Sequence, residues 1–214
     1  MVEIFCQENG FMNGLRKVCF VLLLVFCFSA WSQQAASAAG RKLKVGFFVD
    51  RGSRGGGVMH WARLLTYSPK LAVTLLDAGD IHSGKLKNFD VLIVPGGSST
   101  EQFKSVGKEG AAKIREYVKN GGNYIGICAG FHCALVSPSR FSLVPYKLHR
   151  PAVGRQAVVA VEISKKGAEI LGIAPGERWI NYASGPIARP VEDSWPHGAV
   201  EVVGTARSLH PSKV

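Results

Sequence analysis

Residues 126–130, Gly-Ile-Cys-Ala-Gly, place one cysteine between two glycines where an apolar run gives way to a helical pattern. A strand that runs straight into a helix holds the residue at the turn with its side chain above the edge of the sheet. The neighbours of that residue lie close to adjacent backbone, which explains small residues at Gly126 and Gly130. The start of a helix favours the thiolate form of a cysteine, and the N–H of Ala129 is placed to donate to an oxyanion. We therefore predict that Cys128 is a nucleophile.

A second glycine loop, Val-Pro-Gly-Gly-Ser-Ser-Thr-Glu over residues 94–101, follows another strand pattern at its carboxyl end. Open parallel sheets bind their ligands at that edge, where the two loops would meet. The N–H groups of Gly96 and Gly97 could then complete an oxyanion hole with that of Ala129. Pro-Gly-Gly is also a turn signal in any context, so this loop by itself leaves a plain turn open as an alternative.

Other polar residues near the cysteine have two interpretations each. His132 lies one helical turn after Cys128 and is either a hydrogen-bonding group near the site or a partly buried helix histidine. Glu101 is either close to the thiol or a solvated loop carboxylate. Cys133 is interpreted as a small buried hydrophobic residue. Because about 8 Å along a helix separate the two cysteines, more than the roughly 7 Å that a disulfide spans, we predict two free thiols.

Cofactor and metal signals are weak. Gly55–Gly57 precede a helical pattern and could bind an anion, but the lysine of a phosphate-binding loop does not follow them. His60 and His82 are isolated, and their spacing suggests no metal site. We expect no cofactor and no metal.

The elements that must position these residues alternate between strand and helix. This order and the nearly continuous apolar strands predict an α/β fold, a parallel sheet with helices on both faces. The predicted strands are 43–49, 71–76, 89–94 and 124–127, and the predicted helices are 58–66, 110–120 and 130–135. After Pro138 the pattern is more irregular, with strands at 156–163, 178–183 and 200–205 and a helical turn at 165–171. We predict one domain over residues 41–214.

Three stretches resemble a known family: Asp-Val-Leu-Ile-Val-Pro-Gly-Gly-Ser-Ser from residue 90, Gly-Gly-Asn-Tyr-Ile-Gly-Ile-Cys-Ala-Gly from 121, and Asn-Tyr-Ala-Ser-Gly-Pro from 181. They are similar to the class I glutamine amidotransferase-like superfamily, and within it to the branch of the biotin–protein ligase N-terminal domain. The resemblance implies a flavodoxin-like sheet and a Cys-His-Glu triad. Cys128 matches the cysteine, and Gly97 and Ala129 match the oxyanion donors.

The sequence also departs from that family. The superfamily's His-x-Glu is not found, because His197 is followed by Gly-Ala and His210 by Pro-Ser. We expect the domain to be truncated at its C-terminus, and no biotin-ligase catalytic segment is present to imply ligase activity. Two functions stay open: a cysteine-dependent amidohydrolase or amidotransferase acting on a small-molecule amide, and a non-catalytic module that keeps the fold and binds an unknown ligand or partner.

The net charge bears on possible nucleic-acid partners, and the N-terminal segment bears on where the protein is located in or outside the cell. The 214 residues carry a formal net charge of +11, but the basic residues are scattered, without the clustering on one face that a nucleic-acid site requires. We therefore expect no nucleic-acid partner. Arg16 and Lys17, the apolar run 18–30 and Ala36-Ser-Ala38 predict a signal peptide over residues 1–38 and export to the periplasm or the outside of the cell. An uncleaved signal anchor is the alternative, and the only expected membrane contact.

Cleavage after Ala38 is directly measurable. Expression of the full chain in a host that exports it should give a mature protein that begins at Ala39, because the small residues at 36 and 38 form the cleavage motif. Intact-mass and N-terminal peptide mass spectrometry check this. A mature form that still starts at Met1 would contradict the cleaved signal, and Ala38→Leu is the matched variant that should block processing.

Overall fold

The computed structural model describes residues 5–7, 41–149, 156–183, 185–191 and 200–209. The predicted signal peptide therefore lies outside the described residues, apart from β1 (Phe5–Gln7), which pairs antiparallel with β10 (Val200–Val202). In the described residues no helix is both long and apolar enough to cross a membrane.

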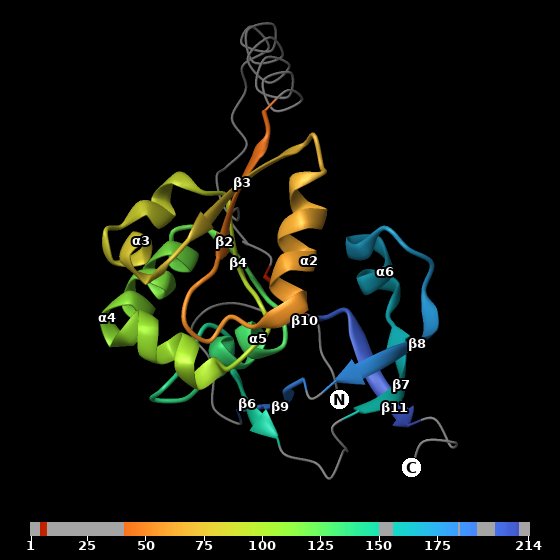
Figure 1. The fold of residues 1–214 in the computed structure, drawn as a ribbon. Coiled ribbons are helices and arrows are strands. Elements are labelled where there is room, and N and C mark those ends of the chain that lie inside the picture. The colour runs from red at the N-terminus through yellow and green to blue at the C-terminus, as the bar shows by residue number, and fades with distance from the viewer. Residues whose placement is uncertain (1–4, 8–40, 150–155, 184, 192–199, 210–214) are drawn as a thin grey trace, which may run out of the picture.

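A four-stranded parallel sheet forms the centre of the molecule (Figure 1). Its strands are β2 (Leu43–Phe48), β3 (Leu71–Leu76), β4 (Val91–Val94) and β5 (Asn123–Gly126). They lie in the order β3-β2-β4-β5, and all three pairings are parallel. The first strand of the sheet is therefore central, and the chain winds outward from it in both directions. This arrangement confirms the predicted flavodoxin-like sheet.

Helices cover both faces of the sheet, as predicted. The helices and helical turn of this part are α2 (Gly55–Thr66), α3 (Ala78–His82), η1 (Lys85–Asn88), α4 (Ser99–Lys119) and α5 (Ala129–Ala134). Alternate residues of a strand point to opposite faces. Phe47 and Ile93 pack with Val58 of α2 on one face, whereas Phe48 and Leu92 pack with α3 and α4 on the other face.

Helix α4 is much longer than predicted. We predicted a helix only over residues 110–120, but the helix begins at Ser99, where the Ser98 side chain accepts a hydrogen bond from the N–H of Glu101. Serine before the first turn is a strong N-cap, and it overrides the weak apolar pattern of this segment. Gly107, with φ 67° and ψ −178°, interrupts the helix, and the part after it contains the helix that the sequence predicted.

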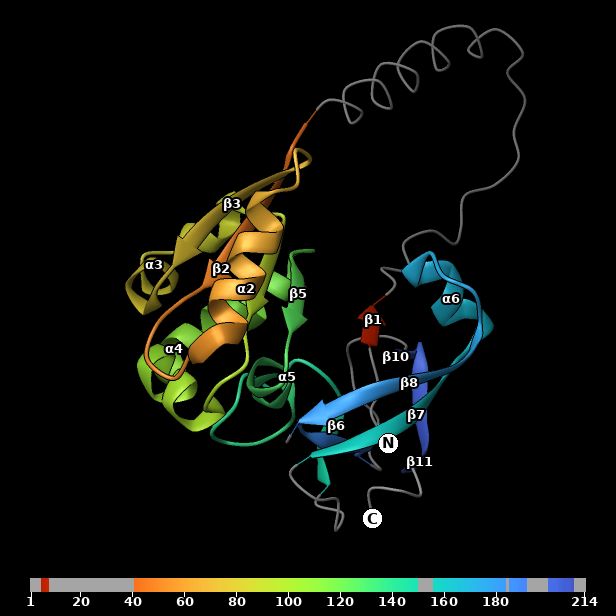
Figure 2. The same ribbon diagram turned by 45° about the vertical axis from the view of Figure 1, so that its right-hand side comes forward.

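The C-terminal part forms two further small sheets (Figure 2). The antiparallel pair of β6 (Tyr146–His149) and β9 (Ile187–Pro190) was not predicted. The strands β7 (Gln156–Ile163), β8 (Gly176–Ala183) and β11 (Gly204–Leu209) form an antiparallel sheet in the order β11-β7-β8. Helix α6 (Lys165–Leu171) occurs where the helical turn was predicted, and its Ala168 packs on this sheet.

The central strand β4 should dominate stability. Leu92 is 0% exposed, so Leu92→Ala should lower the free energy of unfolding by about 2–5 kcal/mol, through lost burial and the cavity left behind. Urea unfolding followed by circular dichroism measures this. Leu64→Ala on α2 removes the same atoms from a side chain that is 51% exposed, and should change the free energy by less than about 0.5 kcal/mol. Equal losses in both variants would contradict the described core.

Candidate functional site

The turn between β5 and α5 is strained at Cys128. Its backbone has φ 52° and ψ −104°, a conformation that residues with a Cβ adopt only at a cost of about 1–3 kcal/mol. The chain is held there by hydrogen bonds from the N–H of Ile127 to the Val94 carbonyl, 2.9 Å, and from the N–H of Gly130 to the Ile127 carbonyl, 2.9 Å. The thiol is partly exposed. The residue before the helix is thus presented at the carboxyl edge of the sheet.

Two glycines permit this turn, as the sequence indicated. A Cβ on Gly130 would lie 2.0 Å from the carbonyl oxygen of Val94, and a Cβ on Gly126 would lie 2.6 Å from the backbone nitrogen of Phe131. Both distances are too short for real atoms. Glycine is therefore required for α5 to start directly against β4 and β5.

The loop after β4 faces this turn. Gly97 has φ 143°, and a Cβ on it would lie 1.9 Å from the carbonyl oxygen of Gly52. Hydrogen bonds run from the N–H of Ser98 to the Gly52 carbonyl, 2.8 Å, and from the N–H of Arg54 to the Gly96 carbonyl, 3.3 Å. Gly97 lies opposite Ser53 between these two hydrogen bonds. In this antiparallel pairing the N–H of Gly97 is not used by the bonds between the two segments. An ideal Cβ on Gly96 would lie 3.4 Å from the Cβ of the cysteine at the turn.

A pocket of about 290 Å³ lies where these loops meet. It contains the predicted nucleophile and both predicted oxyanion donors, and it extends to residues of the C-terminal part. Its lining residues are Gly97, Ser99, Cys128, Ala129, His132, Leu148, His149, Tyr182, Gly185, Pro186 and Ile187. The structure therefore brings Gly97, Cys128 and Ala129 together, whereas Gly126 and Gly130 support the turn from behind.

His132 is a partly buried helix histidine that also lines the pocket. The two interpretations given from the sequence, a buried helix residue and a hydrogen-bonding group near the site, therefore both describe it. Its Nδ1 lies 2.9 Å from the Oγ of Ser99, and its Nε2 lies 3.5 Å from Nη2 of Arg140. Ser99 itself is buried at the start of α4. Because arginine only donates hydrogen bonds, the ring is placed between a hydroxyl and a cation.

The second thiol is part of the core, as predicted. Cys133 is fully buried, and its Sγ lies 3.5 Å from the Ser99 carbonyl oxygen and 3.6 Å from Oε1 of Gln102. Burial raises the pKa of the Cys133 thiol to about 12, so this group is neutral at pH 7. Cys128 and Cys133 are both free.

Two other predicted features have structural roles. Glu101 is in the first turn of α4 and not on a loop, and its carboxylate pairs with Lys104 at 2.9 Å and with Arg51 at 2.7 Å. The hydrogen bond from Lys104, and the charge of Arg51, hold the pKa of the Glu101 carboxyl below its ordinary value. It does not line the pocket. Residues 55–57 form the first turn of α2.

Several pocket residues were not predicted from the sequence. Tyr182, Gly185 and Pro186 belong to the Asn-Tyr-Ala-Ser-Gly-Pro stretch, which was noted for its likeness but given no role. The hydroxyl of Tyr182 donates a hydrogen bond to the Gly185 carbonyl. Burial, and secondly the nearby Cys128, raise the pKa of the Tyr182 phenol, and both residues line the pocket. Nothing in the sequence around His149 signalled its position.

A metal ion would need a group of ligating side chains, and a Cys-His-Glu triad would need a histidine. The described part of the chain contains no group of three or more His, Cys, Asp or Glu side chains that could hold a metal ion. His197 and His210, the histidines tested against the His-x-Glu pattern, lie outside the described residues.

Comparison with known proteins agrees with the predicted resemblance over part of the chain. Residues 52–137, less than half of the chain, match the family described as "Biotin-protein ligase, N terminal". This segment contains both glycine loops and the cysteine, but not Leu148, His149 or the pocket residues 182–187. The comparison with curated proteins gave no match.

The chain is also similar to solved structures. One of them is the 1.5 Å crystal structure of a "Putative Peptidase E Protein" from Listeria monocytogenes EGD-e, at 18% sequence identity and a TM-score of 0.42. The alignment covers 71% of this chain and 88% of that one.

The strain at Cys128 gives a stability prediction. Cys128→Gly and Cys128→Ala both remove the thiol, but only glycine adopts a positive φ without a Cβ penalty. We expect the glycine variant to be more stable than the alanine variant by about 1 kcal/mol, the reverse of the usual order of these two residues. Thermal unfolding of both variants measures the difference. An alanine variant that is the more stable of the two would contradict the strained turn.

Proposed function

We propose that the pocket is a cysteine-dependent amidohydrolase-like site at which Cys128 attacks the carbonyl carbon of a small-molecule amide. One observation carries the proposal. The cysteine stands at a strained strand-to-helix turn, and the pocket that it enters is also lined by Gly97 and Ala129. Backbone strain of this kind persists only where the surrounding structure imposes it, and it gathers at functional sites.

The proposed reaction has two steps. The sulfur of Cys128, having given up its proton to a base, adds to the amide carbonyl carbon, and the oxygen becomes an oxyanion that the N–H groups of Gly97 and Ala129 stabilise. The C–N bond then breaks, and the nitrogen leaves as ammonia or an amine after it takes that proton. Water hydrolyses the resulting thioester, which releases the acid and restores the thiol. The sum is amide plus water giving acid plus amine.

The size and lining of the pocket favour a small substrate. A volume of about 290 Å³ is just below the range for small-molecule sites, which begins near 300 Å³. Apolar walls come from Leu148 and Ile187, and polar groups from His132, His149 and Tyr182. A small amide with a short apolar body fits this mixture.

A second candidate is a non-catalytic module that binds a small ligand in the same pocket. One observation favours it: the His-x-Glu that completes the triad of the resembling superfamily is not found in this sequence. In this alternative the strained turn is retained as a feature of the fold, and Cys128 lines the pocket without reacting.

We also propose that the protein is exported, with residues 1–38 as the signal. The support is the sequence alone: the charged start, the apolar run and the Ala-Ser-Ala motif.

Alkylation separates a reactive thiol from a buried one. Limiting iodoacetamide at pH 7 should modify Cys128 at least about 100-fold faster than Cys133, because the latter is buried and its pKa of about 12 keeps it protonated. Peptide mass spectrometry of the native protein measures both sites. The same protein should release ammonia from a panel of small amides, including L-glutamine, and Cys128→Ser should abolish the release.

The controls decide between the two candidates. Cys133→Ala keeps the proposed nucleophile, so it should keep both labelling and hydrolysis. Selective labelling of Cys128 with no hydrolysis of any amide in the panel would favour the ligand-binding module. Equal or absent labelling of Cys128 in the folded protein would rule out the thiol enzyme.

A further inference from the structure

Two histidines line the pocket with the cysteine, and the structure distinguishes between them. His132 comes from α5, the same helix that Cys128 precedes, whereas His149 ends β6 in the C-terminal part. The reaction proposed above needs a group that takes the proton of the thiol and later gives it to the leaving nitrogen. The sequence offers no His-x-Glu for this role, so the choice rests on how each ring is held.

His132 is badly placed to exchange protons. One ring nitrogen lies 2.9 Å from the hydroxyl of Ser99, and the other lies 3.5 Å from the guanidinium of Arg140. A fixed cation next to an imidazole opposes its protonation. A general base must gain a proton during the reaction, so this environment argues for a role in holding α4 against α5.

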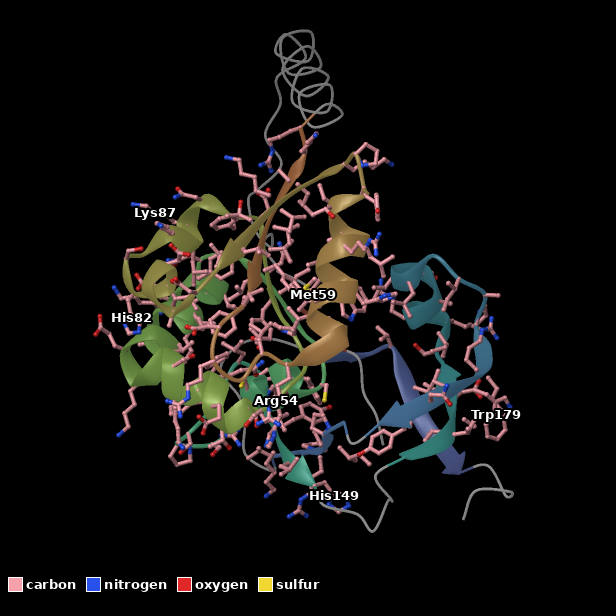
Figure 3. All side chains as sticks on the ribbon, viewed as in Figure 1. Arg54, Met59, His82, Lys87, His149 and Trp179 are labelled. Carbon is pink, nitrogen blue, oxygen red and sulfur yellow. The ribbon has the colours of Figure 1, made fainter. Side chains whose placement is uncertain are left out.

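The ring of His149 is accessible, in contrast to that of His132. Its side chain is exposed at the end of β6, and within the described part of the chain no hydrogen bond or ion pair is assigned to its ring. Figure 3 shows it at the same end of the molecule as Arg54, whose loop pairs with the glycine loop of the pocket, and far from His82. An accessible imidazole that lines the pocket of a thiol can accept and return a proton.

A small apolar cluster fixes β6 relative to the cysteine. Leu135, at the end of α5, packs with Tyr146 of β6 and Ala188 of β9. The Val136 N–H also donates to the Tyr146 carbonyl at 2.7 Å. The strand that ends in His149 is therefore attached to the helix that follows the thiol, which gives a defined position to the pair although the two residues come from different parts of the fold.

The charges around His149 are cationic or neutral. On its own strand Lys147 shares its face, and across the ladder Ile187 lies opposite it and Arg189 opposite Lys147. From the other elements at the pocket come Cys128, His132 and Tyr182. The pocket lining contains no carboxylate among the described residues. The described lining therefore offers no acidic side chain that would compete with the imidazole for the thiol proton.

We propose that His149 is the catalytic general base and acid of this site. It takes the proton from the Cys128 Sγ as the C–S bond forms, and it returns that proton to the amide nitrogen as the C–N bond breaks. A water molecule then gives a proton to the same ring as it attacks the thioester, and the ring returns this proton to the departing sulfur. This assignment rests on the proposed function.

The test compares three histidine variants in the full chain: His149→Gln, His132→Gln and His82→Gln. His82 lies away from the pocket, next to Glu109 of α4, and serves as the matched control. The readout is the rate of Cys128 alkylation by iodoacetamide between pH 6 and pH 9, measured by peptide mass spectrometry. We expect His149→Gln to slow alkylation about tenfold at pH 7. It should have little effect at pH 9, where hydroxide removes the thiol proton without the help of the imidazole.

Hydrolysis gives the second readout. On any amide of the panel that wild-type protein turns over, His149→Gln should lower kcat about 100-fold or more with KM little changed, whereas His82→Gln should change neither. Added imidazole should restore part of the activity to His149→Ala. Circular dichroism checks that each variant is folded, which we expect because the side chain is exposed.

The failures are distinguishable. If wild-type Cys128 reacts no faster at pH 7 than the same cysteine in unfolded protein, the proposed function itself fails. If wild-type Cys128 reacts fast and His149→Gln leaves its pH profile unchanged, only the assignment of His149 is overturned. Loss of the fast reaction in His132→Gln alone would overturn it in favour of His132.

Discussion

The close contact between Gly130 and the carbonyl of Val94 is the constraint on which the rest of the site depends. A Cβ at this position would lie 2.0 Å from that oxygen, so any other residue would push α5 away from β4. With glycine the helix starts directly at the sheet, and Cys128 must adopt φ 52° to connect β5 to it. The cysteine also lies close to the other glycine loop, since a Cβ added to Gly96 would lie 3.4 Å from the Cβ of Cys128. The absence of a side chain at Gly130 therefore allows both the strained backbone of Cys128 and its position close to the loop at Gly96.

The second half of the pocket is built by a different part of the fold. The central sheet contributes the thiol and the two glycine loops, and the strands β6, β8 and β9 contribute or lead into the remaining walls. The apolar cluster around Leu135 joins these parts, because it packs α5 against both β6 and β9. In a pocket at such a junction, the reactive group can lie at the edge of the central sheet, and the C-terminal strands can determine which ligand fits.

Charge is distributed so that carboxylates stay away from the pocket. Glu101 is the acidic residue nearest in sequence to the glycine loop, and its ion pairs with Arg51 and Lys104 hold it outside. The lining that the structure describes contains no Asp, Glu, Lys or Arg side chain. In the proposed reaction, the backbone N–H groups therefore stabilise the oxyanion without competition from a fixed negative charge in the lining.

The sequence by itself determined the parallel sheet, the position of its strands, and the turn at Cys128, because these follow from local patterns: apolar runs, glycines at fixed spacing and helix starts. It missed the first half of α4, where a serine cap outweighed a poor apolar pattern. Only the tertiary structure decided that Ser99 faces His132, and that His149 and Tyr182 reach the pocket. Those residues lie far apart along the chain, and no local pattern encodes which of them the packing of α5 against β6 and β9 brings together.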